Sequence, residues 1–243
     1  MELFGISSSK VSIKINNPEM KRRLELELMT EAEQARTYAQ ADFSEPNAHF
    51  IRLLEALGPG DLAGARAVDL GCGPADIARR FLKAYPRAEC DALDGSAAML
   101  EQARLALDEL PGLAKRCRLI QDVLPSTQLP KSAYDLVLSN SLLHHLHDPQ
   151  VLWQSLRTAA KPGAIVLVMD LMRPPSAMWA ESLVVAYAAD APELLRQDFR
   201  NSLRAAFEPQ EVVAQIKAAG LDGLEVGVVS DRHLAVQGRL AFA

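Results

Sequence analysis

Acidic residues and glycines recur in this chain where short apolar runs end. Asp69 lies near the end of one such run, and Gly71 and Gly73 follow it in the stretch VDLGCGPAD. Glycines let a backbone turn sharply and pass close to a ligand, and a helix beginning after them adds backbone N–H donors. Because Asp69 and Asp76 make the surroundings acidic, the turn favours a ligand with a positive charge over a pyrophosphate.

Similar polar groups follow the next three apolar runs. Asp94 comes about 20 residues after the glycines, the offset at which a carboxylate accepts hydrogen bonds from ribose hydroxyls. Asp122 ends the third run, and Asn140 ends the fourth before SLLHHLHDP. Each acid taken alone is better explained as a helix N-cap or a solvated loop carboxylate. Together, at successive run ends, they predict one binding site.

A parallel sheet is the structure that would bring these run ends together. Apolar runs alternate with segments of helical periodicity, which indicates strands joined by helical crossovers. The five runs are 66–70, 88–94, 116–122, 134–140 and 164–171. Two further strand-like runs, LEVGVVS and RHLAVQGRLAF, predict an antiparallel hairpin at the C-terminal end. We therefore predict an α/β fold with a doubly wound, mostly parallel seven-stranded sheet, and a ligand beyond the C-terminal strand ends.

Two segments lie outside this pattern. Residues 1–50 are expected to form an N-terminal helical cap or arm, with a charged helical stretch over 17–43, and residues 51–243 the main domain. A helical insertion is expected at about 173–208. The strand-like KVSIKI at 10–15 would pair with a sheet edge in its own chain or in a second copy, so a homodimer and a flexible arm both remain open.

Composition narrows the class of protein. The 243 residues include 26 lysines and arginines against 31 aspartates and glutamates, a net charge of −5, which disfavours a nucleic-acid partner. No secretory or membrane-spanning pattern is present. Cys72, Cys90 and Cys117 do not form a metal-type pair and are interpreted as reduced core thiols of a cytoplasmic protein. No metal site is predicted.

The motifs together resemble the class I S-adenosylmethionine-dependent methyltransferases over about 68–171. VDLGCGPA resembles the glycine-rich first motif of that family, LDGSAAMLEQAR the ribose-binding second and QDVLP the adenine-contacting third. The stretch SLLHHLHDP is most similar to small-molecule enzymes related to quinone-biosynthesis and plant-type O-methyltransferases. The resemblance implies a Rossmann-like methyltransferase fold, S-adenosylmethionine as cofactor, S-adenosylhomocysteine as product, and in-line transfer of a methyl group.

The resemblance also implies residue roles at the cofactor. The glycines 71 and 73 would surround its methionine part, while other residues would contact its ammonium group, ribose and adenine. The ammonium group would meet Asp69, Asn140 and Ser141; the ribose would meet Asp94, with Gly95 and Ser96 beside it; the adenine would meet Met99, Asp122 and the Val123 backbone.

The acceptor side is less determined. His144 and His145 are candidate general bases, or else they order their loop. Predicted acceptor contacts are Tyr38, Arg173, Trp179, Tyr187 and Arg200. The two arginines suit a carboxylate or phosphate, or equally a structural salt bridge. We predict methyl transfer to a small, partly apolar molecule, with oxygen favoured over nitrogen, carbon or sulfur. An RNA- or protein-modifying methyltransferase and a cofactor-binding relative with different chemistry are the alternatives.

Overall fold

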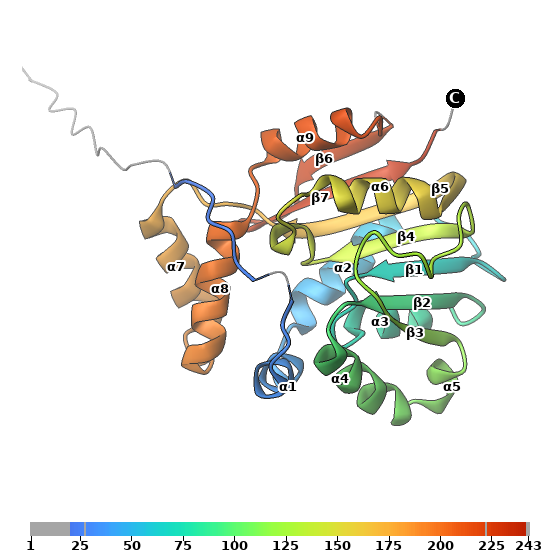
Figure 1. The fold of residues 1–243 in the computed structure, drawn as a ribbon, viewed down its shortest axis with the longest axis horizontal. Helices are drawn as coiled ribbons and strands as arrows, with labels where there is room; N and C mark the ends of the chain where they lie inside the picture. The colour runs from blue at the N-terminus through green and yellow to red at the C-terminus, as the bar shows by residue number, and fades with distance from the viewer. Residues whose placement is uncertain (1–19, 27, 222, 242–243) are drawn as a thin grey trace, which may run out of the picture.

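A seven-stranded sheet organises the described part of the chain, in the order β3-β2-β1-β4-β5-β7-β6 (Figure 1). The computed structural model describes residues 20–26, 28–221 and 223–241. The strands are β1 Arg66–Leu70, β2 Glu89–Asp94, β3 Cys117–Gln121, β4 Tyr134–Asn140, β5 Ala160–Leu171, β6 Leu224–Val228 and β7 His233–Arg239. Strands β1 to β5 pair in parallel, and β7 lies antiparallel between β5 and β6. The predicted fold class is confirmed.

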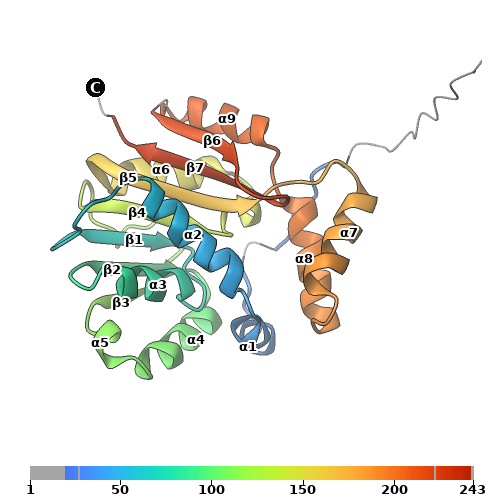
Figure 2. The same cartoon turned by 180° about the vertical axis from the view of Figure 1, so that it is seen from behind.

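Helices cover both faces of the sheet (Figure 2). The helices are α1 Ala32–Gln40, α2 Ser44–Ala56, α3 Asp76–Ala84, α4 Ala97–Asp108, α5 Pro111–Ala114, the 3-10 turn η1 Leu143–His145, α6 Gln150–Ala159, α7 Ala177–Ala188, α8 Glu193–Ala205 and α9 Pro209–Ala218. Side chains alternate along β4: Val137 packs with α6 and α9, while Leu136 and Leu138 pack with α2 and α3. This alternation divides the core into two layers.

The chain before α1 does not form the helix expected there. Residues 20–26 and 28–30, here named the strap, are extended and run beyond the C-terminal strand ends beside α8 (Figure 1). Arg22 donates to the carbonyls of Ala205, His144 and Leu146, and its guanidinium stacks 3.8 Å from the ring centre of Phe207. These distant contacts replace the hydrogen bonds that a helix would have provided, so the helical expectation for this part of 17–43 was wrong.

The two predicted additions have different relations to the core. Helix α2 crosses the expected boundary at residue 50 and belongs to the core, because Phe50 and Leu54 are fully buried. Helices α7 and α8 fill the range 173–208 and pack on each other and on Met20 of the strap. The strand-like 10–15 lies outside the described residues. Within the described part of the chain, no helix is both long and apolar enough to cross a bilayer.

Candidate active site

Asp69 occupies the end of β1 with part of its carboxylate unsatisfied. The side chain is buried, and its Oδ2 has no hydrogen-bond partner. Burial raises the pKa of the Asp69 carboxyl to about 7; the backbone amide of Ala78 opposes this shift, and the charges of Asp94 and Asp76 add to it. A buried carboxylate of this kind gains stability when a cation comes within contact distance.

The turn after Asp69 needs both of its glycines. Gly71 has a φ of +70°, and a Cβ there would lie 2.7 Å from a side-chain carbon of Leu142. Gly73 has a φ of +51°, and a Cβ there would meet no atom within 4 Å. Its backbone N–H donates to Asp94 Oδ2 at 2.8 Å, which ties the turn to the end of β2. Gly71 therefore makes room for packing, whereas Gly73 faces open space.

The strap lies on the residues predicted for the ribose. Asp94 Oδ1 accepts from the Ser96 N–H at 2.8 Å, and Ser96 Oγ both caps α4 and donates to the Met29 carbonyl at 2.5 Å. A Cβ on Gly95 would meet Leu28 at 2.8 Å and Val123 at 2.9 Å. A side chain at position 95 would therefore have to displace the Leu28 and Val123 side chains where the strap approaches the end of β2.

The residues predicted for the adenine lie around the same edge. Met99 is buried in the first turn of α4. Asp122 follows β3 and accepts from the Val123 N–H at 2.9 Å and the Ser126 hydroxyl at 2.7 Å. Asp122 and Val123 therefore bond within their own loop, and their contacts with adenine stay a prediction.

Unpaired polar atoms also gather at the end of β4. Asn140 Oδ1 is buried without a partner, while its Nδ2 reaches Asn47 Oδ1 at 3.5 Å. Elsewhere on α2, His49 Nε2 is also buried and unpaired. Ser141 turns the chain with a φ of +57° and donates its N–H to the Met169 carbonyl. Buried polar atoms without partners are rare in proteins, and Asp69 Oδ2 and Asn140 Oδ1 suit a donor such as an ammonium group.

His144 is paired with Asp170, the penultimate residue of β5. Both side chains are buried, and His144 Nδ1 lies 2.6 Å from Asp170 Oδ1. Burial opposes protonation of His144, but the charge and hydrogen bond of Asp170 outweigh it and raise the pKa of the imidazole. Burial and the adjacent His144 lower the pKa of His145, whose Nδ1 lies 3.3 Å from the Leu26 carbonyl.

Two residues of this site were not predicted from the sequence. Asp170 lies near the end of the apolar run AIVLVMDL in the same way that Asp69 lies near the end of its own, so the same signal could have found it. Glu25 reaches the histidines from the strap, more than 100 positions earlier in the chain. Nothing in its local sequence distinguishes it from the other acids around it.

The five residues predicted to contact the acceptor lie in different surroundings, and the first of them along the chain is Tyr38. Tyr38 packs on Phe43, and burial, together with nearby carboxylates that include Asp76 and Asp170, raises the pKa of its hydroxyl to about 12. Tyr38 therefore lies close to the acidic strand ends.

The two arginines form structural salt bridges, so the structure corrects their assignment to the acceptor. Arg173 is buried between Glu208, at 2.9 Å, and Glu211, at 3.0 Å, where it secures the start of α9. Arg200 joins Glu181 to Glu193, at 3.0 Å each.

The two aromatic residues of α7 are exposed. The Tyr187 hydroxyl donates to Asp231 at 2.6 Å, and Arg232 stacks on its ring. Trp179 is 52% exposed. Their contact with an acceptor stays a prediction.

Comparisons with known proteins agree with this geometry. A family profile described as "Methyltransferase domain" matches residues 68–166. The chain is 33% identical over 132 residues to a trans-aconitate 2-methyltransferase of Enterobacter sp. (strain 638), covering 54% of this chain and 48% of that protein. It is 34% identical over 93 residues to a malonyl-[acyl-carrier protein] O-methyltransferase of Legionella pneumophila, covering 38% and 31%. The chain spans about half the length of the first of these relatives and less of the second.

The fold has close counterparts among solved structures. A SAM-dependent methyltransferase from Aquifex aeolicus superposes with a TM-score of 0.64 at 17% identity, covering 87% of this chain and 99% of that one. That likeness concerns the fold, whereas the profile match covers β1 to β5 with the turns between them. Residues 68–166 thus match a methyltransferase domain, on a fold shared with S-adenosylmethionine-dependent methyltransferases.

Proposed function

We propose that this protein transfers a methyl group from S-adenosylmethionine to a small-molecule acceptor. The observation that carries the proposal is the pair of unsatisfied buried oxygens, Asp69 Oδ2 and Asn140 Oδ1, on the adjacent strands β1 and β4. Beside them, Gly73 leaves open space next to its backbone. Two acceptors suit the ammonium group of an amino acid, and the open space at Gly73 leaves room for the rest of it.

The remaining cofactor contacts follow from the strand ends. Asp94 would accept from the ribose hydroxyls with the oxygen lone pairs that Gly73 and Ser96 leave unused. Met99, Asp122 and Val123 would line the adenine. When bound, S-adenosylmethionine would supply an electrophilic methyl carbon, to which an in-line nucleophile bonds as the carbon–sulfur bond breaks and S-adenosylhomocysteine leaves.

The acceptor side is assigned to η1 and the strap. His144, held by Asp170, and His145 are the groups placed to activate an acceptor hydroxyl or carboxyl. Tyr38 and the strap would cover the reacting atoms and exclude water, which strengthens electrostatic interactions there.

Oxygen is favoured as the acceptor atom for two reasons. Imidazoles suit activation of a hydroxyl, and the Legionella relative is named an O-methyltransferase.

The free thiols of Cys72, Cys90 and Cys117 support a reducing compartment such as the cytoplasm.

Methyl transfer is tested by incubation with S-adenosylmethionine carrying a deuterated methyl group. Di- and tricarboxylic acids, phenols, amines and thiols are offered as acceptors, and products are followed by mass. We expect a labelled oxygen ester or ether together with S-adenosylhomocysteine. Cofactor binding without transfer to any acceptor class would instead indicate a relative with different chemistry.

A further inference from the structure

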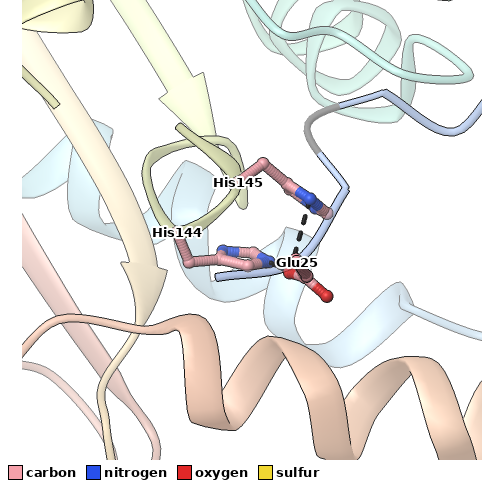
Figure 3. A group of neighbouring side chains, drawn as sticks. All are labelled: Glu25, His144 and His145. Carbon is pink, nitrogen blue, oxygen red and sulfur yellow. Dashed lines mark ion pairs between the residues drawn. The ribbon is translucent and has the colours of Figure 1, made fainter. Parts of the chain in front are cut away.

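Three potential ligand atoms converge beneath the strap. Glu25 Oε1 lies 3.4 Å from His144 Nε2 and 3.4 Å from His145 Nδ1, and all three atoms lie within 4.8 Å of one another. Figure 3 shows Glu25 reaching from the strap toward both imidazoles of η1. The cluster therefore joins two segments that are far apart in the sequence.

Hydrogen bonds do not satisfy this arrangement. Both distances exceed the roughly 2.7–2.9 Å of a charge-assisted hydrogen bond. Glu25 Oε1 is buried and has no hydrogen-bond partner, whereas its Oε2 receives the Ser202 hydroxyl at 3.5 Å. Because Asp170 engages His144 Nδ1, the Nε2 of a neutral imidazole presents a lone pair to the carboxylate. Such a convergence of acceptor atoms is satisfied either by a proton or by a metal ion held between them.

The spacing fits a metal ion. Zinc bonds to histidine nitrogen and carboxylate oxygen are about 2.0–2.2 Å, so the edges of a tetrahedral site are about 3.4 Å. We propose that Glu25, His144 and His145 form a binding site for a divalent transition metal, with zinc as the best match. Two imidazoles, one carboxylate and a fourth open position are a ligand set typical of catalytic zinc.

The surroundings match what a ligating histidine requires. A metal-bound histidine usually donates its second ring N–H to a carboxylate, and Asp170 occupies that place for His144. The Leu26 carbonyl, 3.3 Å from His145 Nδ1, is the contact that metal binding would replace. The use of the open position rests on the proposed function: with both imidazoles bound as ligands, the metal would replace a histidine base, because an acceptor oxygen bound to it would lose its proton more readily.

Zinc binding by chelator-treated protein tests the site directly. Zinc chloride is titrated in competition with a chromogenic chelator, using wild type, Glu25→Gln, His145→Gln and Glu181→Gln. Glu181 lies on α7, pairs with Arg200 and is not among the three converging residues, so its variant is the matched control for Glu25→Gln. We expect one zinc per chain, at least tenfold weaker binding in the first two variants, and unchanged binding in the control.

Other outcomes overturn the proposal. Absence of stoichiometric binding to wild type would mean that protons alone hold the three groups together. Equal binding by wild type, Glu25→Gln and His145→Gln would place the zinc elsewhere, for example on cysteines. A parallel titration with S-adenosylmethionine separates the two hypotheses, since its failure would contradict the proposed function and leave the zinc result standing. Circular dichroism of each variant confirms folding.

Discussion

His144 Nδ1 lies 2.6 Å from Asp170 Oδ1, and both side chains are almost completely buried. This pair links the loop after β4 to the end of β5. Removal of one partner leaves a buried polar or charged group without its counterpart.

The first prediction concerns the energy of this pair. His144→Ala should lower the free energy of unfolding by about 3 kcal/mol, because it strands a buried carboxylate. A double-mutant cycle with Asp170→Ala in urea should give a coupling energy of about 1–3 kcal/mol. Arg200 and Glu181, whose ion pair is more exposed, are the matched control and should couple by less than about 1 kcal/mol. Additive effects of His144→Ala and Asp170→Ala would contradict this.

A second prediction follows from the raised pKa of Asp69. The carboxyl, with a pKa of about 7, is mostly protonated at pH 5.5 and half ionised at pH 7. Because a cationic group binds the ionised form, affinity for S-adenosylmethionine should rise about tenfold over this range. Calorimetry at several pH values measures it. In Asp69→Asn the rise should vanish, and if the same rise persisted there, Asp69 would not be its cause.

The same pKa predicts the stability of the ligand-free protein. A carboxyl whose folded pKa exceeds its unfolded pKa of about 3.9 favours the unfolded state as the pH rises between the two values. Asp69→Asn should therefore gain stability relative to wild type between pH 4 and pH 7. Thermal unfolding of both proteins across this range checks the sign. A difference that stays constant with pH would show that Asp69 titrates normally.

Asp94 provides a third prediction. Asp94→Ala should weaken S-adenosylmethionine binding by on the order of 1–3 kcal/mol, since it removes an acceptor for the ribose and leaves the Gly73 N–H unpaired. Asp91→Asn, on the same strand, is the control. Asp91 pairs with Arg66, Arg118 and Tyr134, so this change should lower stability while the folded fraction binds normally. Equal losses of affinity in both variants would indicate general disruption of β2.

A comparison of two glycines forms the fourth prediction. Gly73 and Gly60 both have a positive φ and open space at Cβ, but Gly60 lies before β1, at the opposite end of that strand. Substitution of either glycine by alanine should lower the free energy of unfolding by about 1–2 kcal/mol, because a residue with a Cβ is strained in the left-handed backbone conformation. Only Gly73→Ala should also weaken S-adenosylmethionine binding, by at least tenfold, because its methyl group enters the space assigned to the ligand. Full affinity in Gly73→Ala would move the ligand away from this turn.

The local sequence was sufficient to predict the strands of the sheet and several of the polar residues at their C-terminal ends. Apolar runs and helical periodicity predicted all seven strands, and Asp69, Asp94 and Asn140 were placed at strand ends because strand direction follows from parallel crossovers. These features depend on residues near one another in the chain. The hairpin was predicted likewise from two short runs and a tight turn.

Features that depend on distant partners were not predictable. The strap is extended because Arg22 and Arg23 bond to residues near 205 and 145, which no local pattern reveals. Arg173 is of a residue type that binds anions, but Glu208 at the N-cap of α9 and Glu211 in its first turn hold it in structural salt bridges. The approach of Glu25 to His144 and His145 required the strap to be placed first.

Binding of S-adenosylmethionine is the most direct test of the central claim. Isothermal titration of the purified protein with S-adenosylmethionine and, separately, with S-adenosylhomocysteine should give one site per chain for each, with dissociation constants in the micromolar range. Failure of both compounds to bind at millimolar concentration would contradict the assignment of the β1, β2 and β4 ends to this cofactor.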